Sequence, residues 1–294
     1  MELTVLEDTV FNLIRHAAIH LPPDVKEALK KAYLNEESEI GKIQLKAILE
    51  NVELAEAHKI PLCQDTGIIT IYVRAGAELK GLDKVEEAII NAVKRATREV
   101  PLRPNAINPI NNQNSGDNTG RFSPQIDWEI VSGDILDLSV LLKGGGSENV
   151  SSLSMLLPGV DFKDLKTFVI ETVIRAGAKP CPPTVLGVAL GGGADLAVKL
   201  AKKALLRPLN KPNSNPKLAK LEEELLEAIN MTGIGPMGLG GKITALKVHV
   251  DYAYRHPASF PVAVAFSCWA LRRASARIYP DGSVEYLTLN SEET

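Results

Sequence analysis

The stretch at residues 59–67 reads KIPLCQDTG and places a thiol, an amide and a carboxylate at three consecutive positions, Cys63, Gln64 and Asp65. A thiolate can hold iron or zinc, and a neighbouring carboxylate can move a proton near that metal. Free cysteine is also among the residue types most often buried for packing alone. The tripeptide by itself therefore leaves a catalytic loop and an inert core position both open.

The segments on either side predict how this stretch is held. Apolar residues recur at helical spacing from Ile43 to about His58, and Pro61 stops that helix. The run from Ile68 to Val73 is rich in β-branched residues and predicts a strand. We therefore expect a loop held by two rigid elements, which is a usual place for chemistry.

Size and composition limit the class of protein. The chain has 294 residues, 45% of them hydrophobic, which is enough for one large domain or two lobes with a sizeable core. Lysine and arginine number 33 against 36 aspartate and glutamate, so the net charge of -3 offers no general attraction for nucleic acid or an anionic membrane. The first residues are acidic, and no apolar run approaches the length of about 20 residues that a membrane span needs. We expect a soluble, cytoplasmic protein.

Three cysteines are spread along the chain, and this spacing excludes several common sites. An odd and sparse set argues against a disulfide framework, and close Cys-x-x-Cys pairs are absent from the sequence. Cys181 lies between Pro180 and Pro182, which stiffen the backbone as a metal-ligand loop requires. A buried cysteine in a rigid turn without a metal would have the same sequence pattern. Cys268 follows a strand-like run that begins near Val262.

The remaining pattern predicts interleaved helices and strands, with no internal repeat and no low-complexity linker. We expect one compact mixed α/β (α+β) domain over residues 1–294 with more than one small sheet. Helices are predicted at 3–34, with a restart at Pro22-Pro23, at 85–96, with Asp83 as its cap, at 161–177, from about 194 to Leu205, and from Asn215-Pro216 onward. Strands are predicted at 185–190, 243–252 and 262–267. Two hairpins are predicted, at 126–142 and at 276–289.

Four loops have compositions that suggest a role. Asn108–Gly120 is rich in amides and is either a surface loop or a segment that orders a polar site. Gly144–Asn149 follows a strand and is either an anion-binding nest or a flexible turn. Gly233–Gly241 has five glycines in nine residues, which predicts close approach to something. Gly191–Gly193 lies between a strand and a helix but lacks the Gly-x-Gly-x-x-Gly spacing of a dinucleotide site.

Taken together, the segments at 61–67, 179–184 and 267–269 closely resemble the three cluster-ligand segments of the iron-sulfur-dependent, class I fumarate hydratases. The glycine-rich segments at 144–149 and 233–241 match that family as well, and the resemblance covers essentially the whole chain. The chain is similar to the alpha subunit of the two-subunit form. Tartrate dehydratase alpha subunits share the pattern.

The resemblance implies a [4Fe-4S] cluster held by Cys63, Cys181 and Cys268, with the loops that carry them converging on one site. Three protein ligands leave the fourth iron an open position, from which it acts as a Lewis acid on a substrate hydroxyl. The whole chain would then be one iron-sulfur hydro-lyase alpha-subunit catalytic domain that acts on a small dicarboxylate.

Matching position to position also assigns roles to other residues. Gln64 and Asp65 would face the substrate, with Asp65 as proton donor or acceptor. Arg103 would clamp a carboxylate with its planar fork, and Gly146 would offer a backbone N–H. His256 falls where the family has a histidine near the cluster, and it would orient or tune Asp65. The other four histidines match nothing in the family pattern.

One departure from the single-chain family members concerns the partner. Those enzymes continue into a C-terminal domain that brings further arginines, a lysine and a threonine that serves as the opposing catalytic base. This chain ends at Thr294 without that domain. We therefore expect a separate beta subunit to complete the active site within a higher-order hetero-oligomer, and the isolated chain to be inactive or nearly so.

Three rival interpretations stay open from the sequence. The nearest keeps the mechanism and replaces the fumarate and (S)-malate pair, which we favour, by the dehydration of L(+)-tartrate to oxaloacetate. A second is an electron-transfer or regulatory iron-sulfur protein, which would need neither Gln64-Asp65 nor Arg103. The third is a zinc-scaffold or purely structural protein, which would be colourless when purified without oxygen.

Overall fold

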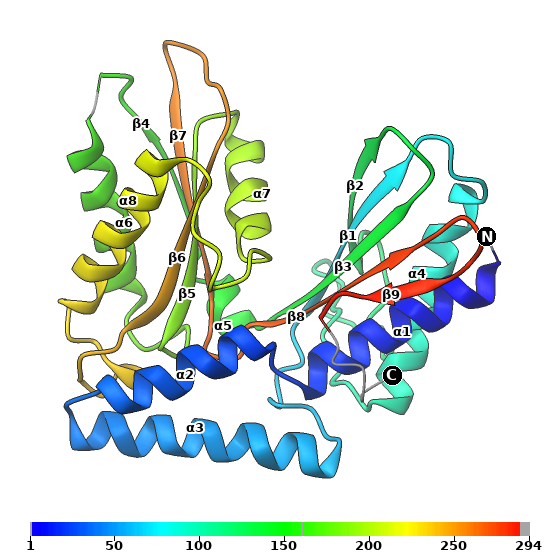
Figure 1. Ribbon diagram of the computed structural model, residues 1–294, viewed down its shortest axis with the longest axis horizontal. Coiled ribbons are helices and arrows are strands. Elements are labelled where there is room, and N and C mark those ends of the chain that lie inside the picture. Colours follow the sequence, from blue (N-terminus) through cyan, green and yellow to red (C-terminus); the bar gives the residue numbers. More distant parts are fainter. Residues whose placement is uncertain (1, 160, 289–294) are drawn as a thin grey trace. The chain divides into compact units, whose positions relative to one another are not determined.

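The computed structural model describes residues 2–159 and 161–288 and divides the chain into two compact units. Within the described residues, unit 1 comprises the segment up to Pro22, Asn51–Gly144 and the segment from Arg272 onward; unit 2 comprises Pro23–Glu50 and Gly145–Leu271. Each unit has its own mixed sheet and its own helices (Figure 1), which confirms the predicted mixed α/β fold with more than one sheet. No helix in the described part of the chain is long and apolar enough to cross a membrane.

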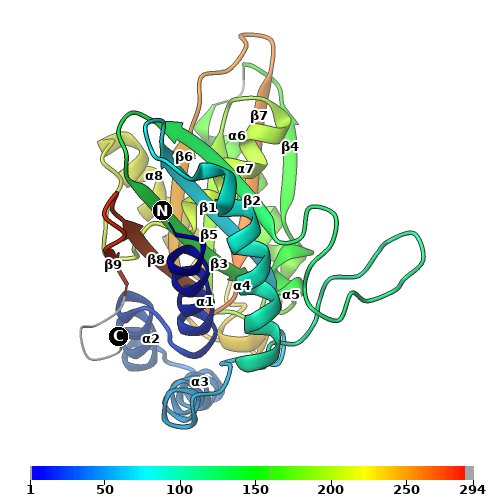
Figure 2. The same cartoon turned by 90° about the vertical axis from the view of Figure 1, so that its right-hand side faces the viewer.

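Unit 1 is a five-stranded sheet with helices packed on one face. The strand order is β2-β1-β3-β8-β9, and the elements are α1 (Leu3–Ile19), β1 (Ile68–Gly76), η1 (Leu82–Lys84), α4 (Val85–Glu99), β2 (Gln125–Val131), β3 (Leu136–Lys143), β8 (Arg272–Ile278) and β9 (Val284–Tyr286). Ile69, Ile71 and Val73 of β1 are buried in one cluster with apolar residues of α1 and α4. Figure 2 shows these two helices beside the sheet. These residues share one face of the strand, and the intervening Thr70 and Tyr72 on the other face are buried as well.

The predicted hairpin at 126–142 is wrong. Both of its strands form, but β1 lies between them and pairs parallel with β2 and antiparallel with β3. The turn instead passes close to the end of β1, where a Cβ added at Gly76 would lie 2.2 Å from the carbonyl oxygen of Gly133. The alternation of residues identified the strands but contained no information about a third strand between them.

Unit 2 is a four-stranded sheet with helices on both faces. The strand order is β4-β7-β5-β6, and the elements are α2 (Pro23–Asn35), α5 (Gly145–Glu148), β4 (Ser152–Leu156), α6 (Phe162–Ala176), β5 (Thr184–Leu190), α7 (Ala194–Ala204), α8 (Pro216–Asn230), η2 (Pro236–Gly238), β6 (Ala245–Tyr252) and β7 (Phe260–Ser267). Helices α6 and α8 cover one face and α7 covers the other (Figure 1). All seven residues of β5 are buried, as expected for a central strand covered on both sides. Helix α3 (Glu39–His58) contributes residues to both units.

The helix starts predicted at residues 161 and 215 are confirmed, and the predicted cap at Asp83 is not. Asp161 caps α6 by accepting from the N–H groups of Lys163 and Asp164, and Asn215 caps α8. Asp83 instead lies inside the short helix η1, and the residue that precedes α4 is Lys84. The last hairpin forms between β8 and β9, while Leu289, its predicted end, lies outside the described residues.

The glycine-rich stretch 233–241 approaches the protein's own Glu36. This carboxylate is 2% exposed and accepts from the N–H groups of the two residues after it and from those of Lys242 and Ile243, at 2.8–2.9 Å. A Cβ added at Gly241, where φ is +139°, would lie 2.8 Å from Glu36 Oε1. Burial acts to raise the pKa of Glu36, but the four backbone hydrogen bonds outweigh it and hold the pKa below its ordinary value.

Candidate functional site

The Cys63 loop is anchored by its neighbour Leu62. The Leu62 side chain is buried, its N–H donates to the carbonyl of Ala18 at 2.9 Å, and its carbonyl accepts from Asn51 Nδ2 at 2.9 Å. Cys63 follows as a half-buried free thiol, and Gln64 is exposed. The loop between α3 and β1 thus has an anchored backbone that carries a half-buried Cys63 and an exposed Gln64.

Asp65 is held at both its backbone and its side chain within unit 1. Its Oδ1 accepts from the Gly67 N–H at 2.9 Å and from Asn105 Nδ2 at 3.3 Å. Its carbonyl accepts from Arg272 Nη1 at 2.8 Å, and Arg272 is only 1% exposed. Gly144 leaves room for this carboxylate, since a Cβ there would lie 3.0 Å from Asp65 Oδ2.

Arg103 lies beside the same loop. Its carbonyl accepts from Thr66 Oγ1 at 3.0 Å and from Asn118 Nδ2 at 3.2 Å, so its backbone is tied to the residue after Asp65. Its side chain is exposed. Unit 1 therefore brings Asp65 and an unburied guanidinium into one neighbourhood, where the arginine can reach an anionic ligand from solvent.

Unit 2 brings Cys181, Cys268 and Gly146 to one edge of its sheet. Cys181 lies shortly before β5 and Cys268 directly after β7, and these strands pair antiparallel with Val185 opposite Ser267. The start of one strand and the end of the other therefore share an edge. Helix α5, which contains Gly146, precedes β4, and β4 pairs antiparallel with β7, so α5 reaches the same edge.

The backbone around Cys181 is tightly fixed. Cys181 has φ of +53°, uncommon for a residue with a side chain, and its N–H donates to the Ala178 carbonyl at 3.0 Å. The Trp269 N–H donates to the Cys181 carbonyl at 3.2 Å, which ties the two cysteine segments together. A Cβ at Gly146 would lie 2.8 Å from the carbonyl oxygen of Lys179, so only glycine fits there. Unusual backbone of this kind is concentrated at functional sites.

His256 lies at the other end of β7. It precedes the strand, which begins at Phe260, whereas Cys268 follows the strand's last residue. Eight strand residues at about 3.3 Å each separate the two ends by more than about 20 Å. The His256 Nδ1 accepts from the Ala258 N–H at 3.1 Å, within its own turn. The structure therefore does not place His256 beside Cys268, because the fully extended strand lies between them.

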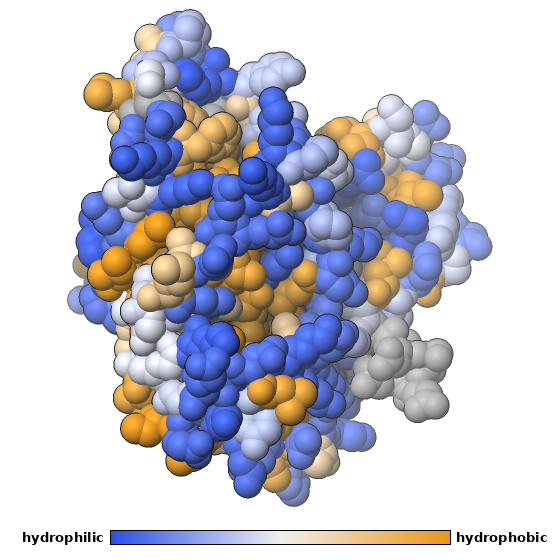
Figure 3. Space-filling model, turned by 60° about the vertical axis from the view of Figure 1, so that its left-hand side comes forward, coloured by the Kyte–Doolittle hydropathy of each residue, from blue (hydrophilic) through white to orange (hydrophobic). Residues whose placement is uncertain are grey.

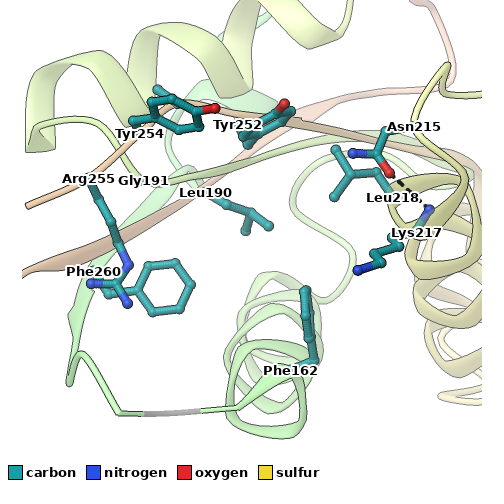
Figure 4. Close-up of a pocket in the computed structure, with 11 residues that line it drawn as sticks. Phe162, Leu190, Gly191, Asn215, Lys217, Leu218, Tyr252, Tyr254, Arg255 and Phe260 are labelled. Atoms are coloured by element: carbon teal, nitrogen blue, oxygen red, sulfur yellow. Dashed lines mark hydrogen bonds between the residues drawn. The ribbon is translucent and has the colours of Figure 1, made fainter. Parts of the chain in front are cut away.

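A pocket of about 480 Å³ also lies at this opposite edge of unit 2. Its lining includes Phe162, Tyr254 and Phe260 (Figure 4). Arg255 is a lining residue too, but its guanidinium donates to four backbone carbonyls and lies 4.7 Å from the centre of the Phe260 ring. The face of the molecule drawn in Figure 3 has both apolar and polar residues at its surface. The pocket is apart from the cysteine edge, and its arginine is already engaged.

The donor set for a metal centre is divided between the units. Unit 2 contributes two cysteines and unit 1 one, and the described residues contain no group of three His, Cys, Asp or Glu side chains placed to hold a metal ion. Each of the three cysteines is a half-buried residue outside any disulfide. Cysteine thiolates are the usual ligands of iron-sulfur clusters, and these three fit that chemistry.

Two residues that contact Asp65 were missed by the sequence analysis. Asn105 lies two positions after Arg103, and Arg272 lies four positions after Cys268. Both are therefore close in sequence to predicted site residues, and that proximity was the available signal. Neither has a spacing that would predict a contact with residue 65.

Comparison with known proteins gives concordant matches. The family model described as fumarate hydratase (Fumerase) matches residues 7–277. A putative L(+)-tartrate dehydratase subunit alpha from Methanocaldococcus jannaschii is 48% identical over 283 residues, covering 95% of this chain and 99% of that protein. The L(+)-tartrate dehydratase subunit alpha of Escherichia coli strain UTI89 is 35% identical over 284 residues, covering 96% and 94%. That of strain K12 is 34% identical over the same length and coverage.

Proposed function

Because the chain belongs to the fumarate hydratase family, we propose that it is the alpha subunit of a hydro-lyase that interconverts fumarate and (S)-malate. The family match over residues 7–277 supports a hydro-lyase. Relatives of nearly the same length are named as alpha subunits, which supports a separate beta subunit as partner. The single observation that carries the proposal is that Cys181, Cys268 and Gly146 lie at the same edge of one sheet. Residues to which the family resemblance assigns cluster and substrate contacts are thus close together in the fold.

We propose Cys63, Cys181 and Cys268 as the ligands of a [4Fe-4S] cluster. The support is the type of donor, the half-buried position of each cysteine outside any disulfide, and the backbone bond between Trp269 and Cys181. When bound, the cluster supplies a Lewis-acidic iron for a substrate hydroxyl. The chain's own contribution is to hold two of the three thiols on one rigid edge, so that little ordering is needed when the group binds.

The remaining residues bind the dicarboxylate and move a proton. Asp65 exchanges the proton, because it is a carboxylate with a fixed backbone in the same loop as Cys63. Arg103 clamps one carboxylate through its planar fork, and Gln64 contacts the substrate from the exposed side of the loop. The Gly146 backbone N–H offers a further donor. His256 lies a full strand away from Cys268, and we assign it no role at the cluster of its own chain.

The dehydration of L(+)-tartrate to oxaloacetate is the second candidate. The names of the relatives favour it, since those above are tartrate dehydratase subunits, one of them only putatively. The two reactions use the same groups and differ in one substrate hydroxyl. The partner subunit would line part of the substrate site for either substrate.

The test begins with the chain purified together with its beta subunit in the absence of oxygen. Iron and sulfide are counted per complex, and rates are measured with fumarate, (S)-malate and L(+)-tartrate. We expect four irons per chain and a faster rate on fumarate and malate than on tartrate. A faster rate on tartrate would establish the second candidate. A cluster whose spectrum ignores all three compounds would favour an electron-transfer protein, and a colourless complex would refute the cluster.

A further inference from the structure

We infer that Asn105 is a positioning residue for Asp65 and fixes the orientation of its carboxylate for proton transfer; this inference rests on the proposed function. Asn105 Nδ2 lies 3.3 Å from Asp65 Oδ1 and 3.2 Å from the carbonyl oxygen of Gly67. An amide nitrogen has two hydrogens, so it can serve both acceptors at once. One side chain thereby joins the carboxylate to the backbone two residues further along and restricts its rotation.

Asn105 is itself held by a chain of buried contacts that begins on a helix. Its backbone N–H donates to Asn118 Oδ1 at 2.6 Å, and Asn118 is only 5% exposed. Asn118 Nδ2 donates in turn to Oγ1 of Thr97 on α4, at 3.1 Å. Thr97 is 7% exposed and also donates to the Val93 carbonyl within that helix. These contacts connect Asp65 to α4 and thereby fix the orientation of its carboxylate. A helix is a more rigid support than a free loop.

The backbone of Asp65 has a separate support. Arg272 on β8 donates from Nη1 to the Asp65 carbonyl at 2.8 Å and is nearly fully buried. The Gly67 N–H also reaches Asp65 Oδ1, at 2.9 Å, without help from Asn105. Removal of the Asn105 amide takes away its bonds to the carboxylate and to the Gly67 carbonyl, while the Arg272 bond still holds the Asp65 backbone in place. This separation distinguishes a positioning role from a general role in folding.

The Asn-rich loop after α4 contains further amides with a different use. The side chain of Asn111 pairs with its near neighbour Gln113: Nδ2 donates to Gln113 Oε1 at 3.1 Å, and Oδ1 accepts from the Gln113 N–H at 3.0 Å. Asn111 is exposed, and the loop between α4 and β2 that contains it extends away from the sheet of unit 1 (Figure 2). It is therefore a matched control for Asn105, with the same side chain in the same loop but engaged at the surface instead of at Asp65.

The experiment compares Asn105→Ala, Asn105→Asp and Asn111→Asp in the complete enzyme with its beta subunit, using fumarate and (S)-malate. We expect both Asn105 variants to lose about 100-fold in kcat, the effect of a small misplacement of a catalytic group. KM should stay within about threefold, because binding contacts are retained. The solvent deuterium isotope effect on kcat should rise as proton transfer becomes slower, while iron per chain stays unchanged. Asn105→Gln, which keeps the amide on a longer stem, should lose less than Asn105→Ala, and Asn111→Asp should match the unsubstituted enzyme.

Two results would overturn the inference. One is a kcat for Asn105→Asp equal to that of Asn111→Asp. The other is a parallel loss of kcat, substrate affinity and iron, which would mark Asn105 as merely structural. An unsubstituted complex without hydro-lyase activity would instead refute the proposed function. In that case, hydrogen exchange of the amides at 63–67 tests the positioning role of Asn105 independently of activity. Faster exchange of the Gly67 amide in Asn105→Ala than in the unsubstituted chain supports that role, and equal exchange refutes it.

Discussion

Glu36→Gln should weaken unit 2 because it alters a carboxylate that serves four backbone donors. Oε1 accepts three N–H groups and Oε2 accepts that of Ile243, all at 2.8–2.9 Å. In the variant, the amide oxygen can keep the first three bonds without their charge, while the NH₂ group faces the Ile243 N–H. One orphaned buried donor costs about 1–3 kcal/mol and the lost charge about 1 kcal/mol for each of the other bonds, so the sum is about 4–6 kcal/mol.

The assay is urea unfolding of the purified chain at pH 7, followed by circular dichroism, together with hydrogen exchange of the Lys242 and Ile243 amides. For a slope of about 3 kcal/mol per molar urea, the midpoint should fall by about 1–2 M. Glu37→Gln is the matched control, because Glu37 is exposed and pairs with the exposed Lys242 side chain. An exposed pair of this kind contributes at most about 1 kcal/mol.

The dependence on pH gives a second readout with a defined sign. The folded-state pKa of Glu36 lies below the ordinary glutamate value of 4.5. The carboxylate's contribution is therefore complete above pH 4.5 and is lost as the pH falls below 4.5 through the folded-state pKa. Between pH 5 and pH 3 the stability gap between Glu36→Gln and the unsubstituted chain should narrow. A variant as stable as Glu37→Gln at pH 7, with unchanged exchange at Lys242 and Ile243, would refute this reasoning.

Three further results are expected. Cys268→Ser should lower the iron bound per chain, because a serine hydroxyl is a poor substitute for a thiolate; iron analysis after anaerobic reconstitution checks this, and full iron content would remove Cys268 from the ligand set. Arg103→Lys should raise KM for fumarate about tenfold or more in steady-state kinetics, because a single ammonium cannot form the two parallel bonds of the guanidinium; an unchanged KM would contradict the clamp. Gly187→Ala should destabilise the chain by about 2–3 kcal/mol in thermal unfolding, since its Cβ would lie 1.9 Å from the Ala201 carbonyl oxygen on α7; a stability equal to that of the unsubstituted chain would show that α7 shifts without cost.

Several features of unit 1 and unit 2 could be predicted because they depend on residues close together in the sequence. The apolar period of α3, the caps at Asp161 and Asn215, and the strand after Gly67 follow from local patterns. For the amide-rich segment Asn108–Gly120 two interpretations were open, and the structure shows features of both: Asn118 is buried and contacts Asn105 and Thr97, whereas Asn111 and Gln113 pair with each other at the surface. Local pattern does not reveal every buried position: Glu222, in a run of three glutamates, is 2% exposed and accepts from the Val250 N–H.

The sequence by itself determined most of the helices and strands, although not α5 and β4, together with the family and the residue types available for catalysis. Local periodicity and motifs require no knowledge of distant contacts. Only the tertiary structure decided which distant segments meet. It inserted β1 between β2 and β3, brought Glu36 to Gly241, and placed Asn105 on Asp65. It also separated His256 from Cys268, twelve residues apart in sequence, because an extended strand carries the chain about 3.3 Å per residue. Strand pairing and buried hydrogen bonds depend on how the whole chain packs, and that information is distributed over residues that no short motif contains.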